Sequence, residues 1–471
     1  MQNKTAYIWG LLSRFAPQVI YLGTTMILAR FLTPDDFGQI GVLSVIFVVA
    51  NVLLDAGLGG SLVKEKEVSD VDCSSIFIFN IFVSLFIYAL LFISSNTLEK
   101  FFGIDDLSAV ICTISLVFPF SALGIVPKAL LNRNLQFRLA FYNSLIGVVI
   151  GSTTSILIAI CGGGVYALVA YQVITVAVTG VANYISSHYK FVVKFSMNSL
   201  VRMLPFGIYT TIISVADTVY ENLITSLTGK YMNVQQAGYL YQAKRIEETM
   251  TLSLTTTINT VSFPILTRLK EDKSKFINES DATFKIITCL SFPLLFCVAS
   301  FAKPIILLLF GNQWIESVPY LEALIFAGTF IIAESLIRNF IKSLCNVRQL
   351  LYVTLVKRII CVLILFSALL ISPQNIIYAY IFTSFIGYIA NLLLYNHLIC
   401  ANVYYSIGKL ILYTLPGVVI YIFMKYLIAD SVSLTMQILI AVVLLLFVYL
   451  VVSKFYGMSI NSLIKLCIKN E

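Results

Sequence analysis

Apolar stretches of about twenty residues recur along the whole chain, and this feature restricts its fold more than any other. A helix of that length crosses the roughly 30 Å hydrocarbon core of a bilayer, whereas a strand exposed to lipid would leave backbone groups unpaired. We therefore predict an all-α polytopic membrane protein with about 14 transmembrane helices. The predicted spans are residues 8–31, 39–62, 74–95, 107–126, 140–161, 165–187, 204–228, 237–264, 280–302, 319–341, 350–371, 375–397, 408–428 and 432–453.

The charge content and the short loops argue against most soluble functions. Charged residues make up 11% of the 471 positions, against about a quarter in ordinary globular domains. No loop between predicted spans is much longer than about twenty residues and no phosphate-binding loop sequence occurs, so neither a soluble catalytic domain nor an ATP-hydrolysing domain is expected. The nine cysteines form no C-x-x-C pair and the chain has two histidines, so no metal centre and no cofactor is predicted.

The distribution of basic residues predicts the orientation of the chain. Loops on the N-terminal side of the predicted topology carry 18 lysines and arginines, and the opposite loops carry five. Cytoplasmic loops hold the excess of basic residues in membrane proteins, so both termini are predicted to be cytoplasmic. The net charge of +8 follows from this topology, and a nucleic-acid partner is not expected.

Two short phrases each have a similar second copy about 200 residues later in the chain. "ARFLTPDDFGQIGVL" (residues 29–43) joins the first two predicted spans, and "GKYMNVQQAGYLYQA" (residues 229–243) joins the seventh and eighth. In the same way "FFGIDD" (residues 101–106) follows the third span and "LFGNQW" (residues 309–314) follows the ninth. The offsets of 200 and 208 residues indicate that spans 1–6 and 7–12 are two copies of one six-helix unit.

An even number of helices in each copy gives both copies the same orientation in the membrane. We therefore predict two six-helix lobes related by a pseudo-twofold axis along the membrane normal. The predicted domains are an N-terminal lobe (1–200), a C-terminal lobe (201–400), and two additional helices with a cytoplasmic tail (401–471). Substrate sites in such folds lie at the interface between repeats, and two lobes around a cleft suit alternating access.

Several blocks give the chain a recognisable family pattern. The first block is "ARFLTPDDFGQIGV" followed by "LLDAGLGGSLVKEKEVSDVD", and the later ones are "FFG", "VPKALLNRNLQFR", "YENLITSLTGKYM" and "FGNQW". Over about residues 5–430 the chain resembles the polysaccharide exporters of the multidrug/oligosaccharidyl-lipid/polysaccharide superfamily, and more narrowly the flippases for O-antigen, colanic-acid and teichuronic-acid repeat units. The resemblance implies a bacterial inner-membrane protein that moves undecaprenyl-pyrophosphate-linked oligosaccharides across the bilayer.

Charged residues inside the predicted spans are the candidate site residues. A central Arg, Lys or Asp costs roughly 2.5–3.5 kcal/mol on the insertion scale and normally faces a cavity or a partner. Arg14 and Asp55 both fall roughly 24 Å from the outer surface at 1.5 Å per residue, so the two can pair. Such a pair is compatible with pinning two helices together and equally with lining a cavity.

A second set of charges falls on spans 7 and 8. Glu221, Lys244 and Arg245 share a depth of roughly 12 Å below the outer surface. Asp217 lies one helical turn from Glu221, and Glu248 lies within one turn of both cations. Charges this dense cannot all face lipid, which favours an aqueous cavity over mutual pinning. The carboxylates of this set could relay a proton or bind Na⁺, and this would couple transport to an ion gradient.

Arg245 is the predicted contact to the pyrophosphate, because a guanidinium binds phosphate through two parallel hydrogen bonds. The family that the chain resembles often has Tyr-x-Arg-Ala at the start of span 8, where this chain reads Leu240-Tyr241-Gln242-Ala243. The cation therefore comes later in this sequence, at Lys244 and Arg245.

Span 10 carries another pair one turn apart, Glu334 and Arg338. Lys357 and Arg358 on span 11 lie near the inner surface, where they either attract an anionic lipid head group or, as we favour, extend their cationic ends to the interface. The tryptophans near span ends, among them Trp314, are predicted to form interfacial belts.

These features predict a flippase that exports a lipid-linked oligosaccharide and makes or breaks no covalent bond. Its predicted partners are the lipid-linked substrate, membrane lipids and, as a candidate, a polysaccharide polymerase. A multidrug or cation antiporter of the same fold is the first alternative, although the carboxylates here come paired with cations, which suits an anionic substrate. A membrane-bound polymerase or ligase is the second, although it requires a large external loop with Arg and His, and the sequence has none.

Overall fold

The computed structural model describes residues 2–55, 58–65, 68–189, 191–192, 194–344, 347–400, 403–428, 436 and 439–445. Almost all of them are helical, which confirms the all-α fold class. The helices in chain order are α1 Gln2–Phe31, α2 Pro34–Asp55, α3 Leu58–Lys64, α4 Asp70–Phe102, α5 Leu107–Ile114, α6 Val117–Arg133, α7 Phe137–Ile160, α8 Val165–Ser186, α9 Met197–Tyr231, α10 Val234–Arg268, α11 Lys273–Ser300, α12 Ala302–Leu309, α13 Ser317–Leu344, α14 Val347–Ile371, α15 Ile376–Ile399 and α16 Val403–Ile422. Three single-turn or irregular helices complete the list: η1 Asn312–Trp314, η2 Pro373–Asn375 and the π-helix η3 Phe423–Ile428.

The predicted spans from 8–31 to 408–428 all lie on these helices, although several of them extend over two elements: 39–62 covers α2 and α3, 107–126 covers α5 and α6, and 408–428 covers α16 and η3. Among the described residues, nine helical segments are long and apolar enough to cross a membrane. The last predicted span, 432–453, lies mostly outside the described residues, so the number of 14 spans stays a prediction.

Two of the long helices begin at polar capping residues. At the start of α4, the Ser69 hydroxyl accepts a hydrogen bond from the Asp72 amide (3.2 Å), and the Asp72 carboxylate accepts one from the Ser69 amide (3.0 Å). This reciprocal cap satisfies two amide groups that a helix start leaves unpaired. At the start of α11, Asp272 accepts a hydrogen bond from the Lys275 amide (3.1 Å) and pairs with the Lys275 ammonium (2.9 Å). These contacts, the one to the Lys275 side chain first, hold the pKa of Asp272 well below its usual value.

Loops that the sequence places on one side of the membrane lie together in the fold. On the side predicted to be outside, the Lys230 ammonium donates to the carbonyl oxygen of Phe101, so the second copy of the longer phrase meets the loop that contains "FFGIDD". On the side predicted to be inside, Arg133 Nη1 donates to the carbonyl oxygen of Leu62 at 2.8 Å. The Ser74 and Tyr189 hydroxyl oxygens, on the same side, lie 3.1 Å apart. These contacts agree with the predicted grouping of the loops that they join, and which group faces the cytoplasm stays a prediction.

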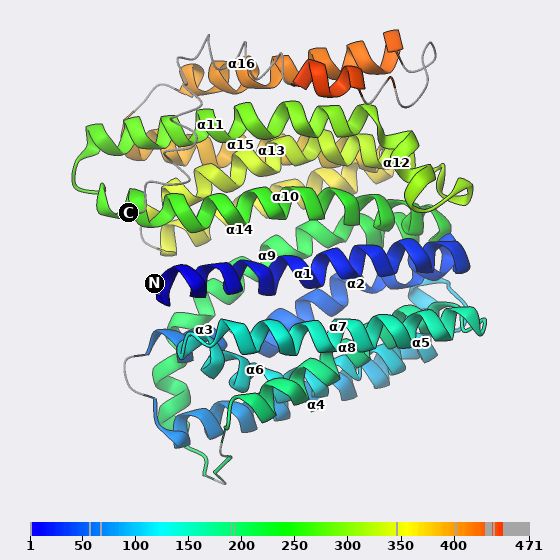
Figure 1. Ribbon diagram of the computed structural model, residues 1–471, viewed down its shortest axis with the longest axis vertical. Helices are drawn as coiled ribbons and strands as arrows, with labels where there is room; N and C mark the ends of the chain where they lie inside the picture. Colours follow the sequence, from blue (N-terminus) through cyan, green and yellow to red (C-terminus); the bar gives the residue numbers. More distant parts are fainter. Residues whose placement is uncertain are drawn as a thin grey trace. The chain divides into compact units, whose positions relative to one another are not determined.

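Contacts divide the chain into two compact units, Met1–Gln242 (unit 1) and Ala243–Glu471 (unit 2). In unit 1, α7 lies beside both α1 and α8 (Figure 1). The same unit contains α9 and the first turns of α10, because α9 packs along α2. In unit 2, α13 and α14 both pack on α15, and α16 packs on α11. The lobe boundary at residue 200 was predicted from the repeat and stays a prediction.

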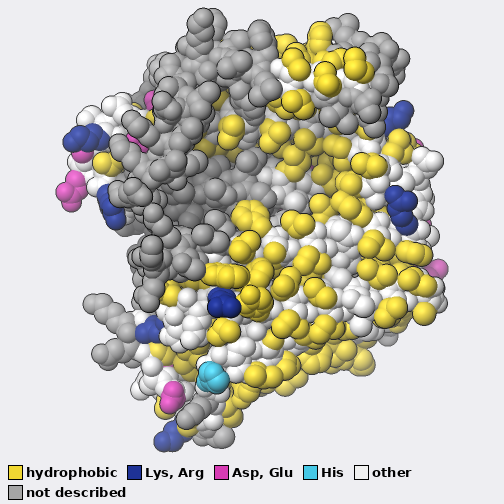
Figure 2. Space-filling view, viewed as in Figure 1, with side chains coloured by type: hydrophobic (Ala, Val, Ile, Leu, Met, Phe, Trp, Pro, Cys, Tyr) yellow, Lys and Arg dark blue, Asp and Glu magenta, His cyan; other side chains and the backbone are white. Residues whose placement is uncertain are grey.

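The side chains on the visible surface agree with a protein that faces lipid. In Figure 2, hydrophobic side chains make up most of the coloured surface, and lysine, arginine and carboxylate side chains are few. Large apolar side chains such as Phe82, Ile93 and Leu370 are 70%, 78% and 89% exposed. In a bilayer such side chains face hydrocarbon and not water, so their exposure does not carry the usual cost of placing apolar surface in water.

Trp314 corrects one sequence prediction. It was expected at the membrane interface, but its side chain is fully buried in unit 2, and its ring centroid lies 6.1 Å from that of Phe310. The tight turn at "FGNQW" explains this placement, because Gly311 adopts a positive φ of 98° and the chain reverses into η1 toward the protein interior.

Candidate functional site

Of the predicted partners Arg14 and Asp55, the structure describes the side chain of Asp55 only. The side chain of Arg14 lies outside the described part of the structure, so the proposed ion pair stays a prediction. Asp55 ends α2, and its Oδ1 accepts a hydrogen bond from the amide of Gly59 (3.3 Å), in the first turn of α3. In the described structure Asp55 therefore caps the first turn of α3.

The two carboxylates on α9 differ in their surroundings. Asp217 is buried, with 9% of its surface exposed, whereas Glu221, one turn later, is exposed. Both belong to unit 1, and both have polar or electrostatic partners. The shared helix face predicted for them does not give them a shared environment.

The charges at the start of unit 2 lie on a single helix, α10. Lys244 Nζ lies 3.5 Å from Glu248 Oε1, and Arg245 Nη1 lies 3.7 Å from Glu248 Oε2. Lys244 is 5% exposed and Glu247 is 4% exposed, whereas the side chain of Arg245 is 35% exposed. One carboxylate thus faces two cations, and of these two cations Arg245 is the more accessible.

A second charged cluster surrounds Glu334 on α13, which is 2% exposed. Its Oε1 atom accepts hydrogen bonds from Arg338 Nη2 (2.7 Å) and Lys357 Nζ (2.5 Å). Arg358 Nη2 (3.4 Å) and Asn391 Nδ2 (3.3 Å) approach the same oxygen. We call these five residues the Glu334 cluster. It joins α13, α14 and α15 within unit 2, and it holds three cations against one carboxylate.

Burial explains why the Glu334 cluster needs several donors. Moving a carboxylate out of water costs several kcal/mol, and only charge-assisted hydrogen bonds of good geometry return that cost. Lys357 and Arg358 are 2% and 5% exposed, so the favoured prediction that they extend to the membrane interface is wrong. The predicted contact between Glu334 and Arg338 is present. The contribution of Asn391 was missed, and its only signal in the sequence is an amide in a largely apolar span that also contains Asn396.

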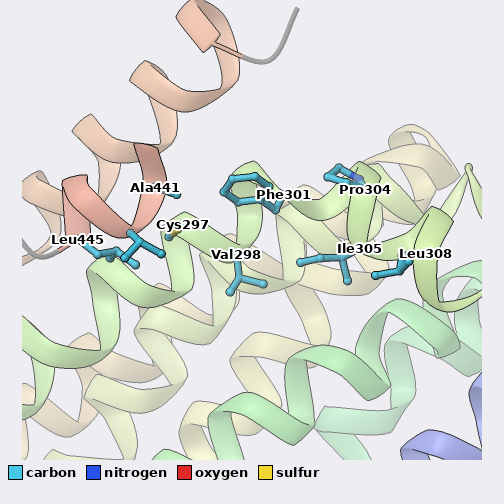
Figure 3. Close-up of a pocket in the computed structure, with 9 residues that line it drawn as sticks. Cys297, Val298, Phe301, Pro304, Ile305, Leu308, Ala441 and Leu445 are labelled. Atoms are coloured by element: carbon cyan, nitrogen blue, oxygen red, sulfur yellow. The ribbon is translucent and has the colours of Figure 1, made fainter. Parts of the chain in front are cut away.

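One cavity in unit 2 has a purely apolar lining. It measures about 280 Å³ and lies between α11, α12 and residues 439–445 (Figure 3). Its wall includes Cys297, Phe301, Ile305 and Leu445, and it offers no hydrogen-bonding partner to a phosphate or a sugar. This cavity is therefore not the site for the polar part of a substrate. Among the described residues no group of His, Cys, Asp and Glu is arranged to hold a metal ion.

Comparison with known proteins gives relatives of one kind. The chain is 22% identical over 361 residues to an uncharacterized membrane protein in the cps region of Klebsiella pneumoniae, covering 76% of this chain and 74% of that one. It is 24% identical to the succinoglycan biosynthesis transport protein ExoT of Rhizobium meliloti, covering 67% and 64%. It is also 24% identical to the lipopolysaccharide biosynthesis protein WzxC of Escherichia coli, covering 64% and 62%.

Solved structures share the fold. The lipid II flippase MurJ in an inward closed conformation superposes with a TM-score of 0.72 at 16% identity, over 96% of this chain and 99% of that one. An outward-facing multidrug resistance transporter of the MATE family, also of the MOP superfamily, superposes with a TM-score of 0.54 at 12% identity, over 83% and 94%.

The family model described as "polysaccharide biosynthesis protein" matches residues 27–319, which is more than half of the chain. The match begins just before the first copy of the longer phrase and ends just after "LFGNQW", so it includes all four repeated phrases. The chain therefore belongs to the polysaccharide biosynthesis protein family of multi-pass membrane proteins.

Proposed function

We propose that the protein is a flippase that moves an undecaprenyl-pyrophosphate-linked oligosaccharide from the cytoplasmic to the outer leaflet of a bacterial inner membrane by alternating access. The observation that carries the proposal is the family match. The fold is that of a solved flippase, and the relatives are named for succinoglycan transport and lipopolysaccharide biosynthesis. The protein moves its substrate and catalyses no covalent step.

The charged clusters support an anionic substrate. The Glu334 cluster has three cations and one carboxylate, and α10 sets Lys244 and Arg245 against Glu248. Each carboxylate in these contacts is occupied by protein cations. An exchanger of cationic drugs would instead use a carboxylate that is available to its substrate, so the same fold is better suited here to a pyrophosphate or an acidic sugar. Coupling to a proton or sodium gradient is part of the proposal.

Deletion of the gene tests the proposal. We expect lipid-linked repeat units to accumulate on the cytoplasmic leaflet, and their exposure at the periplasmic face of spheroplasts, read with a membrane-impermeant lectin, to fall. A plasmid copy of the parent gene should restore exposure. Unchanged periplasmic exposure together with increased sensitivity to cationic drugs would instead establish the antiporter.

Arg245 allows a sharper test of the phosphate contact. Arg245→Ala should abolish export and Arg245→Lys should retain part of it, because an ammonium keeps the charge but loses the bidentate geometry. The fold should tolerate both changes, since Lys244 still pairs with Glu248 at 3.5 Å. Lys303→Ala, which removes an exposed cation from α12, is the matched control and should export normally. Full export by the alanine variant, at equal protein level, would reject a role for Arg245 in binding phosphate.

A further inference from the structure

The linker between α8 and α9, residues 187–196, is held in place by two serines of α4. Its described residues form no helix. The Ser74 hydroxyl accepts a hydrogen bond from the Val192 amide at 3.0 Å, and the Ser75 hydroxyl accepts one from the Ser196 amide at 2.8 Å. Both serines are fully buried. Two amides outside any helix are thus paired with protein groups, which is the condition for irregular backbone to lie at the edge of a membrane.

One side of the linker packs into unit 1. The chain leaves α8 through His188, whose φ of 50° is the left-handed conformation that commonly follows the end of a helix. Tyr189 then joins a buried cluster that includes Ile76. The ring centroid of Phe77 lies 5.8 Å from that of Tyr189 and 5.5 Å from that of Phe191. Side-chain packing and backbone hydrogen bonds therefore fix the linker against α4.

The other side of the linker presents apolar side chains outward. Phe191 is 40% exposed, Phe195 is 53% exposed, and Met197, the first residue of α9, is 61% exposed. Lys194, which lies between the two phenylalanines in the sequence, is exposed as well. A surface that faces water rarely gathers apolar side chains of this size, whereas segments at a membrane surface combine aromatic rings with lysine.

The helices on either side of the linker extend the same apolar surface. Ile185, in the last turn of α8, is 67% exposed, and Val201, in the second turn of α9, is 57% exposed. Helix α8 is long and apolar enough to cross a membrane, so the linker follows directly from a surface that faces hydrocarbon. The loop charges place this end of α8 inside. This continuity favours a lipid surface over a soluble protein as the partner of the linker.

We propose that the linker is a preformed anchor for anionic phospholipid in the leaflet on the side predicted to be cytoplasmic. Phe191, Phe195 and Met197 insert below the lipid head groups, and the Lys194 ammonium pairs with a head-group phosphate. Because α4 already holds the linker in shape, little conformational entropy is lost when lipid binds. The anchor concerns the surrounding bilayer and does not depend on which substrate is transported.

A fluorescent probe at residue 195 tests the insertion. Phe195→Cys, in a cysteine-free background, is labelled with the environment-sensitive fluorophore NBD and reconstituted into phosphatidylcholine vesicles. A lipid with a nitroxide near its head group should quench this probe strongly, and a water-soluble quencher should quench it weakly. Glu271→Cys, in the exposed loop between α10 and α11, is the matched control and should show the opposite pattern.

The control carries the same fluorophore, so partitioning of the label itself cannot imitate insertion of residue 195. Circular dichroism of each labelled protein, compared with the parent, confirms that it is folded. If only the water-soluble quencher reaches the probe at residue 195, the linker faces water, as a site for a soluble partner would, and the inference is wrong.

An anionic lipid tests the role of Lys194. Nitroxide-labelled phosphatidylglycerol should quench the probe at residue 195 more than the same content of nitroxide-labelled phosphatidylcholine. Lys194→Gln should remove this difference and leave the quenching by phosphatidylcholine unchanged. Lys270→Gln, which removes an exposed cation from the loop between α10 and α11, is the matched control and should preserve the difference. Equal quenching by the two lipids in the parent protein would reject the head-group contact.

The serine contacts allow a test of the preformed shape. Ser75→Ala leaves the Ser196 amide without its acceptor, so the water-soluble quencher should reach the probe at residue 195 more readily. Ser94→Ala is the matched control, because the Ser94 hydroxyl donates to the Leu90 carbonyl oxygen within α4 itself at 2.7 Å. Unchanged quenching in folded Ser75→Ala protein would show that the lipid and not α4 orders the linker, and would overturn the preformed anchor.

Discussion

Glu334→Ala is expected to destabilise the protein by about 3–5 kcal/mol, which is enough to remove most folded protein from the membrane. In the folded state, Glu334 Oε1 accepts hydrogen bonds from Arg338 at 2.7 Å and from Lys357 at 2.5 Å. Alanine leaves Lys357 and Arg358 buried, and Arg338 half-buried, without their common carboxylate. The large cost comes from these stranded cations, since the ion pair itself contributes little net stability.

Thermal unfolding of purified protein in detergent micelles, together with the amount of protein in the membrane fraction, measures this effect. Glu316→Ala, which removes an exposed carboxylate just before α13, is the matched control and should change stability by less than about 0.5 kcal/mol. Glu334→Gln should fall between the two, because it keeps a hydrogen-bond acceptor and loses the charge. A Glu334→Ala protein that unfolds at the parental temperature would contradict the importance of the cluster.

Lys357→Met tests the loss of one donor while the carboxylate of Glu334 is kept. Glu334 would still accept from Arg338 at 2.7 Å and face Arg358 at 3.4 Å, so the loss should be clearly smaller than for Glu334→Ala. An equal loss in both variants would instead show that Lys357 provides the essential charge in this part of the fold.

Trp314→Ala is expected to cost a similar amount, about 3–5 kcal/mol, for a different reason. The indole is fully buried beside Phe310, so truncation leaves a large cavity that the turn at Gly311 cannot fill by collapsing. Trp314→Phe keeps an aromatic ring and should lose much less.

Thermal unfolding followed by circular dichroism measures the Trp314 effect without depending on tryptophan fluorescence. Leu308→Ala is the control, because the Leu308 side chain lies in the neighbouring helix and is 73% exposed. An unchanged unfolding temperature for Trp314→Ala would mean that the repeated "FGNQW" loop does not support the packing of unit 2.

The helices could be predicted from the sequence because the cost of an unpaired backbone in lipid leaves an apolar stretch of twenty residues no other structure. The contact between Glu334 and Arg338 could also be predicted, since it joins residues one turn apart on one helix. Lys357 and Asn391 come to the same oxygen from two other helices, and the rotation of those helices about their axes is not encoded in hydropathy. For the same reason the burial of Trp314 was not foreseen.

Glu221 shows the limit of depth arguments. Counting residues along a helix gives a height in the membrane, and Asp217 and Glu221 are correctly placed one turn apart by that count. Height does not distinguish the buried Asp217 from the exposed Glu221. The mutual contact of the two repeated phrases was likewise not predicted, although their register of 200 residues was the strongest indication of the duplication.

In unit 1, a Cβ atom on Gly38 would overlap the carbonyl oxygen of Val234, and one on Gly238 would overlap that of Pro34. Under the predicted duplication, this reciprocity has a consequence for the ancestry of the chain. Two residues that each meet the other's neighbour form an isologous interface, the kind that identical subunits make in a dimer. A six-helix ancestor would have formed the same crossing as a dimer of two identical chains. One glycine position in its sequence would have supplied both sides of that crossing. If the predicted duplication arose by fusion of two genes, it left the crossing in place and its two sides free to diverge; Pro34 and Val234 are the differing residues at matching positions.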